Sequence, residues 1–258
     1  MVQRTKKNLK SFYEKEAKSL PSHQELMYLK GDKHELWWHR KRLGYIIYFL
    51  SEIFRKNEVI TFVDVGCAEG YYVKIVAEAQ RKTFCVGADI ARTYIKKAKK
   101  NCNVANVDYV VCDIENLPFK SESVNVVVCS EVLEHVLNYK SAILELFRIG
   151  KKHLIISFPG HTCIYEVIRK IKPLKEFAEK LVADVGHISE VRIEDLQKIL
   201  RGRFASFEVK IAGALPLILV KMFPSIRFVD VIDEIICKVL RRFNALEYVT
   251  IHVVKVVK

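Results

Sequence analysis

The stretch that decides the fold is Val63-Asp64-Val65-Gly66-Cys67-Ala68-Glu69-Gly70. An apolar segment leads into it, and a helix-like segment begins near Tyr71. A buried strand, a glycine-bearing turn and a helix N-terminus together predict a nucleotide-sized binding corner, although an ordinary strand–helix connection can look the same. Gly66 and Gly70 let the backbone approach a ligand, and Asp64 can reach across the turn. The G-x-x-x-G spacing differs from the G-x-G-x-x-G pattern of dinucleotide enzymes, which argues against an NAD dehydrogenase.

Three further apolar segments end in polar side chains at informative distances. The segment Phe84–Asp89 ends in an acid about nineteen residues after Gly70, where a carboxylate can bind both ribose hydroxyls. Residues 107–112 are followed by Asp113, and residues 124–129 run into Ser130. With the first strand, expected at 59–63, four strand ends carry polar groups toward the sheet edge where open α/β folds bind ligands.

The remaining elements are read from hydrophobic periodicity. We expect further strands at residues 154–158, 207–211 and 248–254, and helices at residues 4–18, 33–55, 163–182 and 193–201. Trp37 and Trp38 are adjacent on the second of these helices, so their side chains point about 100° apart. We expect one tryptophan to pack on the core and the other to face the mouth of the site.

This series of motifs resembles the class I S-adenosylmethionine (SAM) methyltransferases over roughly residues 35–200. The resemblance implies an α/β, Rossmann-like sheet of seven strands with the last strand antiparallel. It also implies SAM as the cofactor and methyl transfer as the reaction. The expected organisation is an N-terminal helical cap, residues 1–57, and a SAM-binding domain, residues 58–258, with an apolar insert before the last strand.

The resemblance assigns cofactor contacts to the strand ends. The turn with Gly66 and Gly70 would hold the methionine part of SAM, Asp89 the ribose and Asp113 the adenine amine. The expected cofactor residues are Arg42, Asp64, Gly66, Cys67, Ala68, Gly70, Asp89, Ile90, Asp113, Ile114 and Ser130. Ala68 stands where the family usually has a glycine, and we expect binding to survive with a slightly shifted turn.

Within the family, the chain is most similar to the ubiquinone-biosynthesis O-methyltransferases, which carry a type 11 methyltransferase domain. Their segment before the first strand contains an arginine that binds the SAM carboxylate, and Arg42-Leu43-Gly44-Tyr45-Ile46 looks like that segment. Their fourth strand ends in a Glu-x-x-Glu-His pattern, which Glu131, Glu134 and His135 match. The resemblance implies a small or lipid-like acceptor with a hydroxyl group.

A histidine is the expected catalytic base. The SAM methyl group transfers by in-line displacement, so the protein must align a nucleophile, exclude water and, for a hydroxyl, remove its proton. His135 is the first candidate because it follows the fourth strand, with His187 second and His161 third. The alternative is that His135 only caps the following helix.

A metal-dependent variant stays open beside this expectation. Glu131, Glu134, His135 and His187 resemble the ligand set of the small-RNA 3′-terminal 2′-O-methyltransferases, which use a divalent ion. The first three are spaced so that they can share one helix face. Because the Glu-x-x-Glu-His pattern also occurs in methyltransferases without metal, we expect no metal here.

Composition is consistent with one large domain in a reducing compartment. The chain has 258 residues, half of them apolar, and its seven cysteines are scattered without a C-x-x-C pair. That pattern disfavours a cysteine zinc site and favours buried free thiols in the cytoplasm. No apolar run follows the basic N-terminal residues, so we expect no secretory signal.

The net charge of +13 is carried mainly by residues 1–60 and 161–258, which flank the cofactor motifs. A basic rim can attract RNA, anionic lipid head groups or an acidic metabolite, and a lysine-rich thermophile-like surface gives the same charge. No aromatic RNA-binding motif is present, so nucleic acid is not favoured. An RNA ribose methyltransferase and a catalytically silent SAM-fold scaffold are the alternative functions.

The insert, residues 212–244, is the least typical part of the chain. Its apolar run at residues 215–220 is too short to span a bilayer, and a second run from Val229 to Val239 has helical spacing. We expect a lid over a hydrophobic acceptor, a membrane-surface helix, a dimer contact, or extra core over the sheet edge. Peripheral membrane contact and a monomeric or homodimeric state are therefore both left open.

Overall fold

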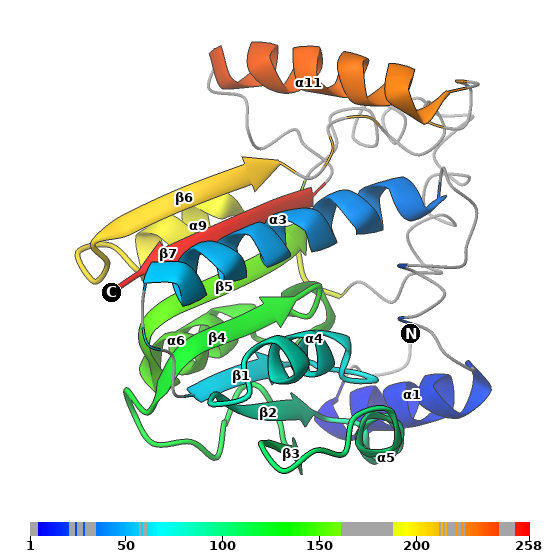
Figure 1. Cartoon of the computed structure of the whole chain (residues 1–258), viewed down its shortest axis with the longest axis vertical. Coiled ribbons are helices and arrows are strands. Elements are labelled where there is room, and N and C mark those ends of the chain that lie inside the picture. The colour runs from blue at the N-terminus through cyan, green and yellow to red at the C-terminus, as the bar shows by residue number, and fades with distance from the viewer. Residues whose placement is uncertain are drawn as a thin grey trace.

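The computed structural model describes residues 5–20, 24, 28, 35–56, 58, 61–160, 188–211, 213, 215, 220, 223, 225–242 and 251–258 (Figure 1). Helices and strands follow one another along the chain as the sequence predicts. In order they are α1 (Lys6–Ser19), α3 (Glu35–Lys56), β1 (Thr61–Val65), α4 (Tyr71–Ala79), β2 (Phe84–Asp89), α5 (Arg92–Asn101), β3 (Val107–Val111), β4 (Val124–Ser130), the 3₁₀ turn η2 (Leu133–His135), α6 (Tyr139–Ile149), β5 (Gly150–Pro159), α9 (Ile193–Ile199), β6 (Ser206–Ile211), α11 (Ile226–Arg242) and β7 (Ile251–Val257). The expected helix at 163–182 lies outside the described residues.

The seven strands form one sheet in the order β3-β2-β1-β4-β5-β7-β6. Strands β1 to β5 are parallel, whereas β7 is antiparallel to both β5 and β6, which confirms the predicted sheet. Chain order reverses at β1, which has β2 on one side and β4 on the other. The carboxyl ends of these two neighbours of β1 therefore border the crevice in which open α/β sheets bind ligands.

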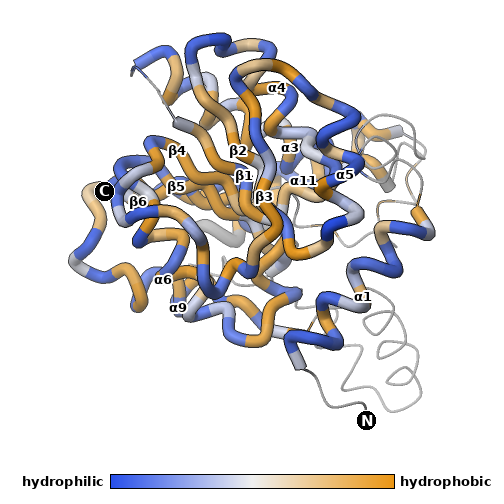
Figure 2. The backbone as a smooth tube through the Cα atoms, turned by 90° about the horizontal axis from the view of Figure 1, so that it is seen from below, coloured by the Kyte–Doolittle hydropathy of each residue, from blue (hydrophilic) through white to orange (hydrophobic). Residues whose placement is uncertain are grey.

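Alternate strand residues supply two separate cores because side chains in a strand point to opposite faces. Phe62 belongs to the core cluster that includes buried residues of α3, α4 and α5, and Val63 to the cluster that includes buried residues of α6 and α9. Figure 2, in which each residue is coloured by its hydropathy, shows the strands as mostly hydrophobic residues between these helices. The sheet is thus buried on both faces, as a parallel sheet requires.

Strand bounds differ from the predicted ones where charged residues interrupt an apolar run. Strand β5 begins at Gly150 rather than at residue 154, although Lys151 and Lys152 are exposed. Strand β7 ends at Val257 rather than at residue 254, because Lys255 is accommodated by an ion pair with Glu208 at 3.0 Å on the adjacent strand. Both strands are extended by their pairing with neighbouring strands. A local sequence pattern carries no information about that pairing.

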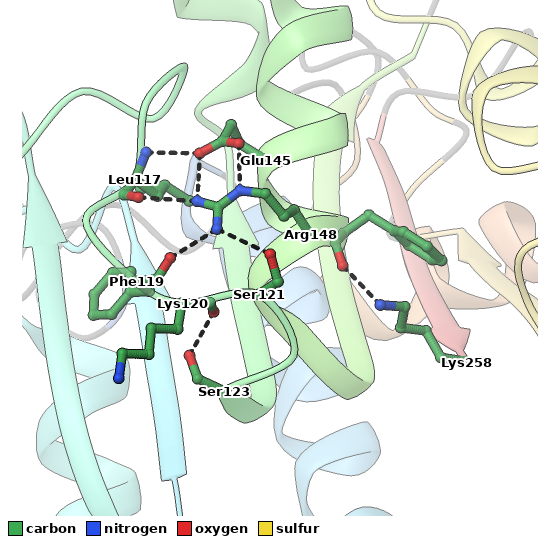
Figure 3. Close-up of polar contacts among 9 residues, drawn as sticks. Leu117, Phe119, Lys120, Ser121, Ser123, Glu145, Arg148 and Lys258 are labelled. Atoms are coloured by element: carbon green, nitrogen blue, oxygen red, sulfur yellow. Dashed lines mark hydrogen bonds and ion pairs between the residues drawn. The ribbon is translucent and has the colours of Figure 1, made fainter.

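Arg148 on α6 holds the loop between β3 and β4 in place (Figure 3). Its guanidinium donates to the carbonyls of Leu117 at 3.0 Å and Phe119 at 2.8 Å, and it pairs with Glu145 at 2.6 Å. Glu145 in turn accepts a hydrogen bond from the backbone N–H of Leu117 at 2.9 Å. This loop begins immediately after β3, so the Arg148 contacts also fix the strand end that carries Asp113.

The described part of the insert packs against α3. Trp37 donates to Asp230 at 2.7 Å, and Trp38 donates to the carbonyl of Leu215 at 3.0 Å. Lys41 pairs at 2.7 Å with Asp233, which is fully buried. Neither tryptophan lines the cavity described below, so the expectation that one would face the site is wrong: both contact the insert instead.

Among the described residues, no helix is long and apolar enough to cross a membrane.

Candidate functional site

A cavity of about 630 Å³ lies at the carboxyl ends of β1, β2, β3 and β4. Helix α1, two residues of the segment after it, and α3 line the side opposite the strand ends. The lining residues are Lys6, Leu9, Phe12, Tyr13, Glu16, Gln24, Tyr28, His39, Arg42, Asp64, Val65, Gly66, Ala68, Tyr72, Ala88, Asp89, Ile90, Tyr94, Cys112, Asp113, Ile114, Glu115, Ser130, Glu131, Val132, Glu134, His135, Val136 and Leu137. Most of the predicted cofactor residues therefore face one space.

The turn after β1 has three residues in the left-handed region. Gly66, Ala68 and Gly70 have φ of 77°, 45° and 80°. A Cβ at Gly66 would lie 2.2 Å from Cγ2 of Val132, so glycine is required there. Ala68 adopts the same hand at a cost of roughly 1 kcal/mol, and its N–H donates to Asp89 Oδ2 at 2.9 Å. The alanine thus keeps the turn that a glycine would form more easily.

Two of the predicted contacts in this turn do not line the cavity. Cys67 is fully buried in the core cluster beneath the turn, and Gly70 is the N-cap of α4. These two residues shape the turn from behind. Their predicted direct contact with a ligand has no support in the lining of the cavity.

Asp64 is a buried carboxyl group, and the partly buried Asp89 is close enough to repel its negative charge. Burial raises the pKa of Asp64 to about 8, and Asp89 adds to the effect. Burial also raises the pKa of Asp89 to about 6, against the hydrogen bonds it accepts from the N–H groups of Ala91 at 2.8 Å and Ala68. Asp64 Oδ2 has no hydrogen-bond partner among the described residues. A buried carboxyl group with an unpaired oxygen is ready for a polar group of a ligand.

The pKa of Asp64 predicts how the stability of the unliganded protein depends on pH. The folded protein holds the Asp64 proton up to about pH 8, whereas the unfolded chain loses it near the usual value of 3.8. The contribution of Asp64 to the free energy of unfolding is therefore most favourable below about pH 4. It is lost as the pH rises toward 8.

We expect Asp64→Asn to raise the free energy of unfolding at pH 8 by about 2 kcal/mol, or the Tm by roughly 4–8 °C, and to change little at pH 4. Thermal unfolding followed by circular dichroism at both pH values measures this. Asp108→Asn, at an exposed aspartate of β3, is the control and should shift neither. A variant that is destabilised at pH 8 would contradict the prediction.

Helix α1 is fastened over the cavity at its N-terminal end by Lys6. Lys6 Nζ lies 2.8 Å from Asp113 Oδ2 and 2.9 Å from Glu115 Oε2, and these two hydrogen bonds raise the pKa of Lys6. Asp113 Oδ1 also accepts the N–H of Glu115 at 2.9 Å. The predicted adenine contact is therefore engaged by a cation of the chain itself.

A second attachment of α1 is made by Glu14. Helix α5 begins after Ala91, whose side chain cannot cap the helix. Glu14 supplies the cap from α1, because its carboxylate accepts the N–H of Arg92 at 2.7 Å, the N–H of Thr93 at 3.2 Å and the Thr93 hydroxyl at 2.6 Å. The two attachments hold Tyr13, which lies between them, at the cavity.

Arg42 is buried at the boundary between α3 and the cavity. Its Nη1 lies 3.2 Å from Glu131 Oε2, and its Nη2 donates to the hydroxyl of Tyr28 at 3.0 Å. Burial lowers the pKa of Arg42, but Tyr28 and Glu131 outweigh it, so the net pKa is raised and the charge is kept. Arg42 Nε has no partner among the described residues. The guanidinium is thus held in place and charged, and its Nε–H can still donate a hydrogen bond to a ligand.

The residues after β4 do not form the helix face expected for Glu131, Glu134 and His135. Glu131 has φ of 55° and precedes the 3₁₀ turn η2, which contains the other two. The left-handed conformation of Glu131 changes the direction of the chain. The prediction that the three residues share one face of a helix is therefore wrong. Ser157 bridges Ser130 at 2.9 Å and Glu131 at 3.0 Å, tying this segment to β5.

His135 lines the cavity beside Glu134 and Tyr13. Its Nε2 lies 3.7 Å from Glu134 Oε1, and its ring meets Tyr13 edge to face with centroids 5.8 Å apart. Burial, and then Glu131, raise the pKa of Glu134 well above its usual value. The proximity of an acid, an imidazole and an aromatic ring gives this corner the groups needed for proton transfer.

The other candidate histidines, His187 and His161, lie outside the described residues. The residues after His187 are described: Ile188 and Ser189 donate to the carbonyl of Glu134 at 2.8 and 3.0 Å. Within the described parts of the chain, no group of three or more His, Cys, Asp or Glu residues is arranged to hold a metal ion.

Several lining residues escape analysis of the sequence. Lys6 and Tyr13 of α1, and Gln24 and Tyr28 after it, are brought to the site only by tertiary packing. Gln24 accepts the N–H of Tyr71 at 3.1 Å at the start of α4. The only local signal is the Tyr71-Tyr72 pair directly after the glycine turn, which places one aromatic residue on the cavity.

Comparison with known proteins identifies the central part of the chain. Residues 63–157 match the family model described as a methyltransferase domain. The ubiquinone/menaquinone biosynthesis C-methyltransferase UbiE of Desulfotalea psychrophila is 24% identical over 102 residues, which are 40% of this chain and 39% of that protein. The malonyl-[acyl-carrier protein] O-methyltransferase of Bacillus cereus is 24% identical over 139 residues, 53% of this chain and 51% of that protein.

The matches to these curated relatives span about half of their length or less. A solved structure covers the whole fold: magnesium protoporphyrin IX methyltransferase from Synechocystis PCC 6803 with bound SAH has a TM-score of 0.65 and 16% identity, over 98% of this chain and 100% of that chain. At this identity the structural likeness establishes the fold.

Proposed function

We propose that this chain, which carries a methyltransferase domain over residues 63–157, is a SAM-dependent methyltransferase that acts on a hydroxyl of a small or lipid-like acceptor. The observation that carries the proposal is the convergence of Asp64, Asp89, Asp113 and Arg42 on one cavity at the carboxyl edge of the sheet. Three strand-end acids and one buried arginine match the polar groups of an amino-acid-bearing nucleoside.

The groups left without partners support a SAM site. Asp64 Oδ2 and Arg42 Nε have no partner among the described residues, and Gly66 presents backbone without a side chain to the same cavity. In the proposed site Arg42 holds the carboxylate of SAM, Asp89 its ribose and Asp113 its adenine amine. SAM supplies an activated methyl group on a sulfonium, which is a good leaving group.

The residues of the chain then have three tasks: orientation, removal of a proton and exclusion of water. His135 takes the proton of the acceptor hydroxyl, and Glu134 at 3.7 Å becomes easier to ionise once His135 is charged. Tyr13, held by α1, covers the same corner. Water exclusion strengthens these charge interactions because the local dielectric is low.

An apolar acceptor fits the rim of the cavity. Phe12 and Leu137 both line it, yet their side chains remain 50% and 37% exposed. Val136 and Leu9 add further apolar side chains to the lining. Exposed apolar side chains at a cavity favour an apolar ligand. The similar proteins include a ubiquinone/menaquinone biosynthesis C-methyltransferase, a malonyl-[acyl-carrier protein] O-methyltransferase and a phthiotriol/phenolphthiotriol dimycocerosates methyltransferase.

The test of this function is a transfer screen with methyl-labelled SAM against separate lipid-extract, quinone-like and RNA pools. We expect label in the lipid or quinone-like pool, and loss of that label with Asp89→Ala. Label in RNA alone would favour the ribose methyltransferase reading. SAM binding without transfer to any pool would favour the catalytically silent scaffold.

The role of Arg42 makes a separate prediction. Lysine keeps the positive charge but loses the planar, multiply donating guanidinium, so we expect Arg42→Lys to weaken SAM binding about tenfold. Isothermal calorimetry measures the affinity for SAM. Circular dichroism checks that the variant is still folded, because the substitution also changes the contacts with Glu131 and Tyr28. Arg55→Lys, on an exposed arginine of the same helix, is the matched control. Equal affinity in Arg42→Lys and the parent would exclude Arg42 from the cofactor site.

A further inference from the structure

The outer face of α11 carries a row of exposed apolar side chains. Phe228, Val231, Ile235 and Val239 are 54%, 57%, 56% and 49% exposed. Their spacing of three or four residues places them on one stripe of the helix, which we call the outer stripe. Figure 1 shows α11 at one end of the molecule, beyond α3 and the β6 edge of the sheet.

The opposite side of α11 is firmly attached, so the stripe is not the inner face of a loosely placed helix. Val229 is fully buried in a cluster with Trp37, and Asp230 accepts the Trp37 indole N–H. Asp233 pairs with Lys41 and also accepts the N–H of Leu215 at 3.1 Å. These contacts fix which face of α11 points outward.

Charge at the outer stripe is asymmetric. By helical position the exposed Arg227 and Lys238 lie along one side of the stripe, and the exposed Arg242 lies at its C-terminal end. Glu234, which pairs with Lys238 at 3.0 Å, is the exposed acid beside them. The two aspartates of the helix are engaged on the inner side. The outward side of α11 is therefore apolar with a net basic flank, on a chain whose net charge is +13.

We propose that α11 docks on the surface of a bilayer containing anionic lipids, with the outer stripe in the acyl–headgroup boundary and the basic flank toward the head groups. A helix of 17 residues is about 25 Å long and charged along one side, which suits a position in the plane of the surface rather than across it. Charge complementarity selects the bilayer as the occupant. The proposal does not depend on methyl transfer and goes beyond it.

Vesicle co-sedimentation of the full chain tests the proposal. We expect binding to phosphatidylcholine vesicles that contain phosphatidylglycerol, weaker binding to phosphatidylcholine alone, and loss of the preference at high salt. Each buried aliphatic side chain contributes roughly a factor of ten, so Val231→Glu with Ile235→Glu should reduce partitioning about 100-fold. Arg227→Glu with Arg242→Glu should remove the preference for anionic vesicles.

The control is Leu144→Glu on α6, an apolar side chain that is 43% exposed away from α11, and it should leave binding unchanged. Circular dichroism should show equal unfolding temperatures for all variants, because every substituted side chain is exposed. The proposal is overturned if the parent does not bind anionic vesicles, or if the Val231 and Ile235 changes leave binding intact. It is equally overturned if those changes only convert a dimer into a monomer in light scattering, since a second copy would then cover the stripe.

Discussion

Replacing Asp89 by alanine is expected to weaken SAM binding by roughly 30- to 1000-fold, or about 2–4 kcal/mol. The variant removes the carboxylate proposed to bind the ribose hydroxyls. It also removes the acceptor for the N–H groups of Ala68 and Ala91, which shape the turn. Asp89→Asn keeps one acceptor oxygen and nearly the same shape, so it should fall between the parent and the alanine variant.

Calorimetry with SAM measures both variants, with Asp108→Ala as the control. Because the pKa of Asp89 is raised to about 6, its charged form is lost as the pH falls through that value. We therefore expect SAM affinity of the parent to decline below about pH 6 and that of Asp89→Asn to be less sensitive. Unchanged affinity in Asp89→Ala at pH 7.5 would remove the ribose assignment.

Loss of His135 should affect the rate rather than cofactor affinity. If the imidazole takes the proton of the acceptor, His135→Ala lowers kcat by roughly 10²–10⁴, whereas the Kd for SAM stays within about twofold of the parent. The pH–rate profile should also lose its limb for the base. His153→Asn removes a buried histidine of β5 that does not line the cavity, and it should leave kcat unchanged.

A chelator distinguishes the base from a metal site at the same residue. We expect activity to be unaffected by chelation. Activity that is lost with chelator and restored by a divalent ion, with similar losses on substitution of Glu131, Glu134 and His187, would replace the base by a metal. If neither chelator nor His135→Ala changes turnover, alignment alone drives the transfer.

Most strands of the sheet could be predicted from sequence because each contains a local apolar run, whereas the antiparallel last strand was implied by the resemblance to a known family. The parallel strands β1 to β4 are short and largely apolar, and β2 and β4 end in a polar residue, Asp89 and Ser130, at the ligand edge. Strand β1 extends to Val65, beyond the expected end at residue 63, because Asp64 interrupts the apolar run in the sequence although it is buried in the structure. Functional sites are where local hydrophobicity and tertiary position disagree.

The candidate site was predictable only where it depends on strand ends. Asp89 and Asp113 line the cavity as expected, but Glu14 and Lys6 act across 78 and 107 residues of sequence. No periodicity in α1 distinguishes such contacts from those of a solvated helix. The prediction of a helix face after Glu131 was wrong for a different reason. A residue other than glycine that adopts the left-handed conformation has no signature in the sequence.

Some expectations stay predictions: the division at residue 57, the role of His187, the cytoplasmic location, the thermophile-like surface and the oligomeric state. The structure describes part of the insert, including α11. Among the expected roles of the insert, extra packing agrees with the contacts between α11 and α3, whereas the lid, the membrane-surface helix and the dimer contact stay predictions.

Helix α3 gives two distant surfaces a common support. Lys41 forms an ion pair with Asp233 of α11, and the next residue, Arg42, lines the cavity. Two adjacent residues of a rigid helix cannot be displaced independently. Any coupling between the surfaces is then reciprocal: the factor by which a bound bilayer changes the affinity for SAM equals the factor by which SAM changes the affinity for the bilayer. Cofactor supply and membrane occupancy would thus regulate each other without a dedicated regulatory site.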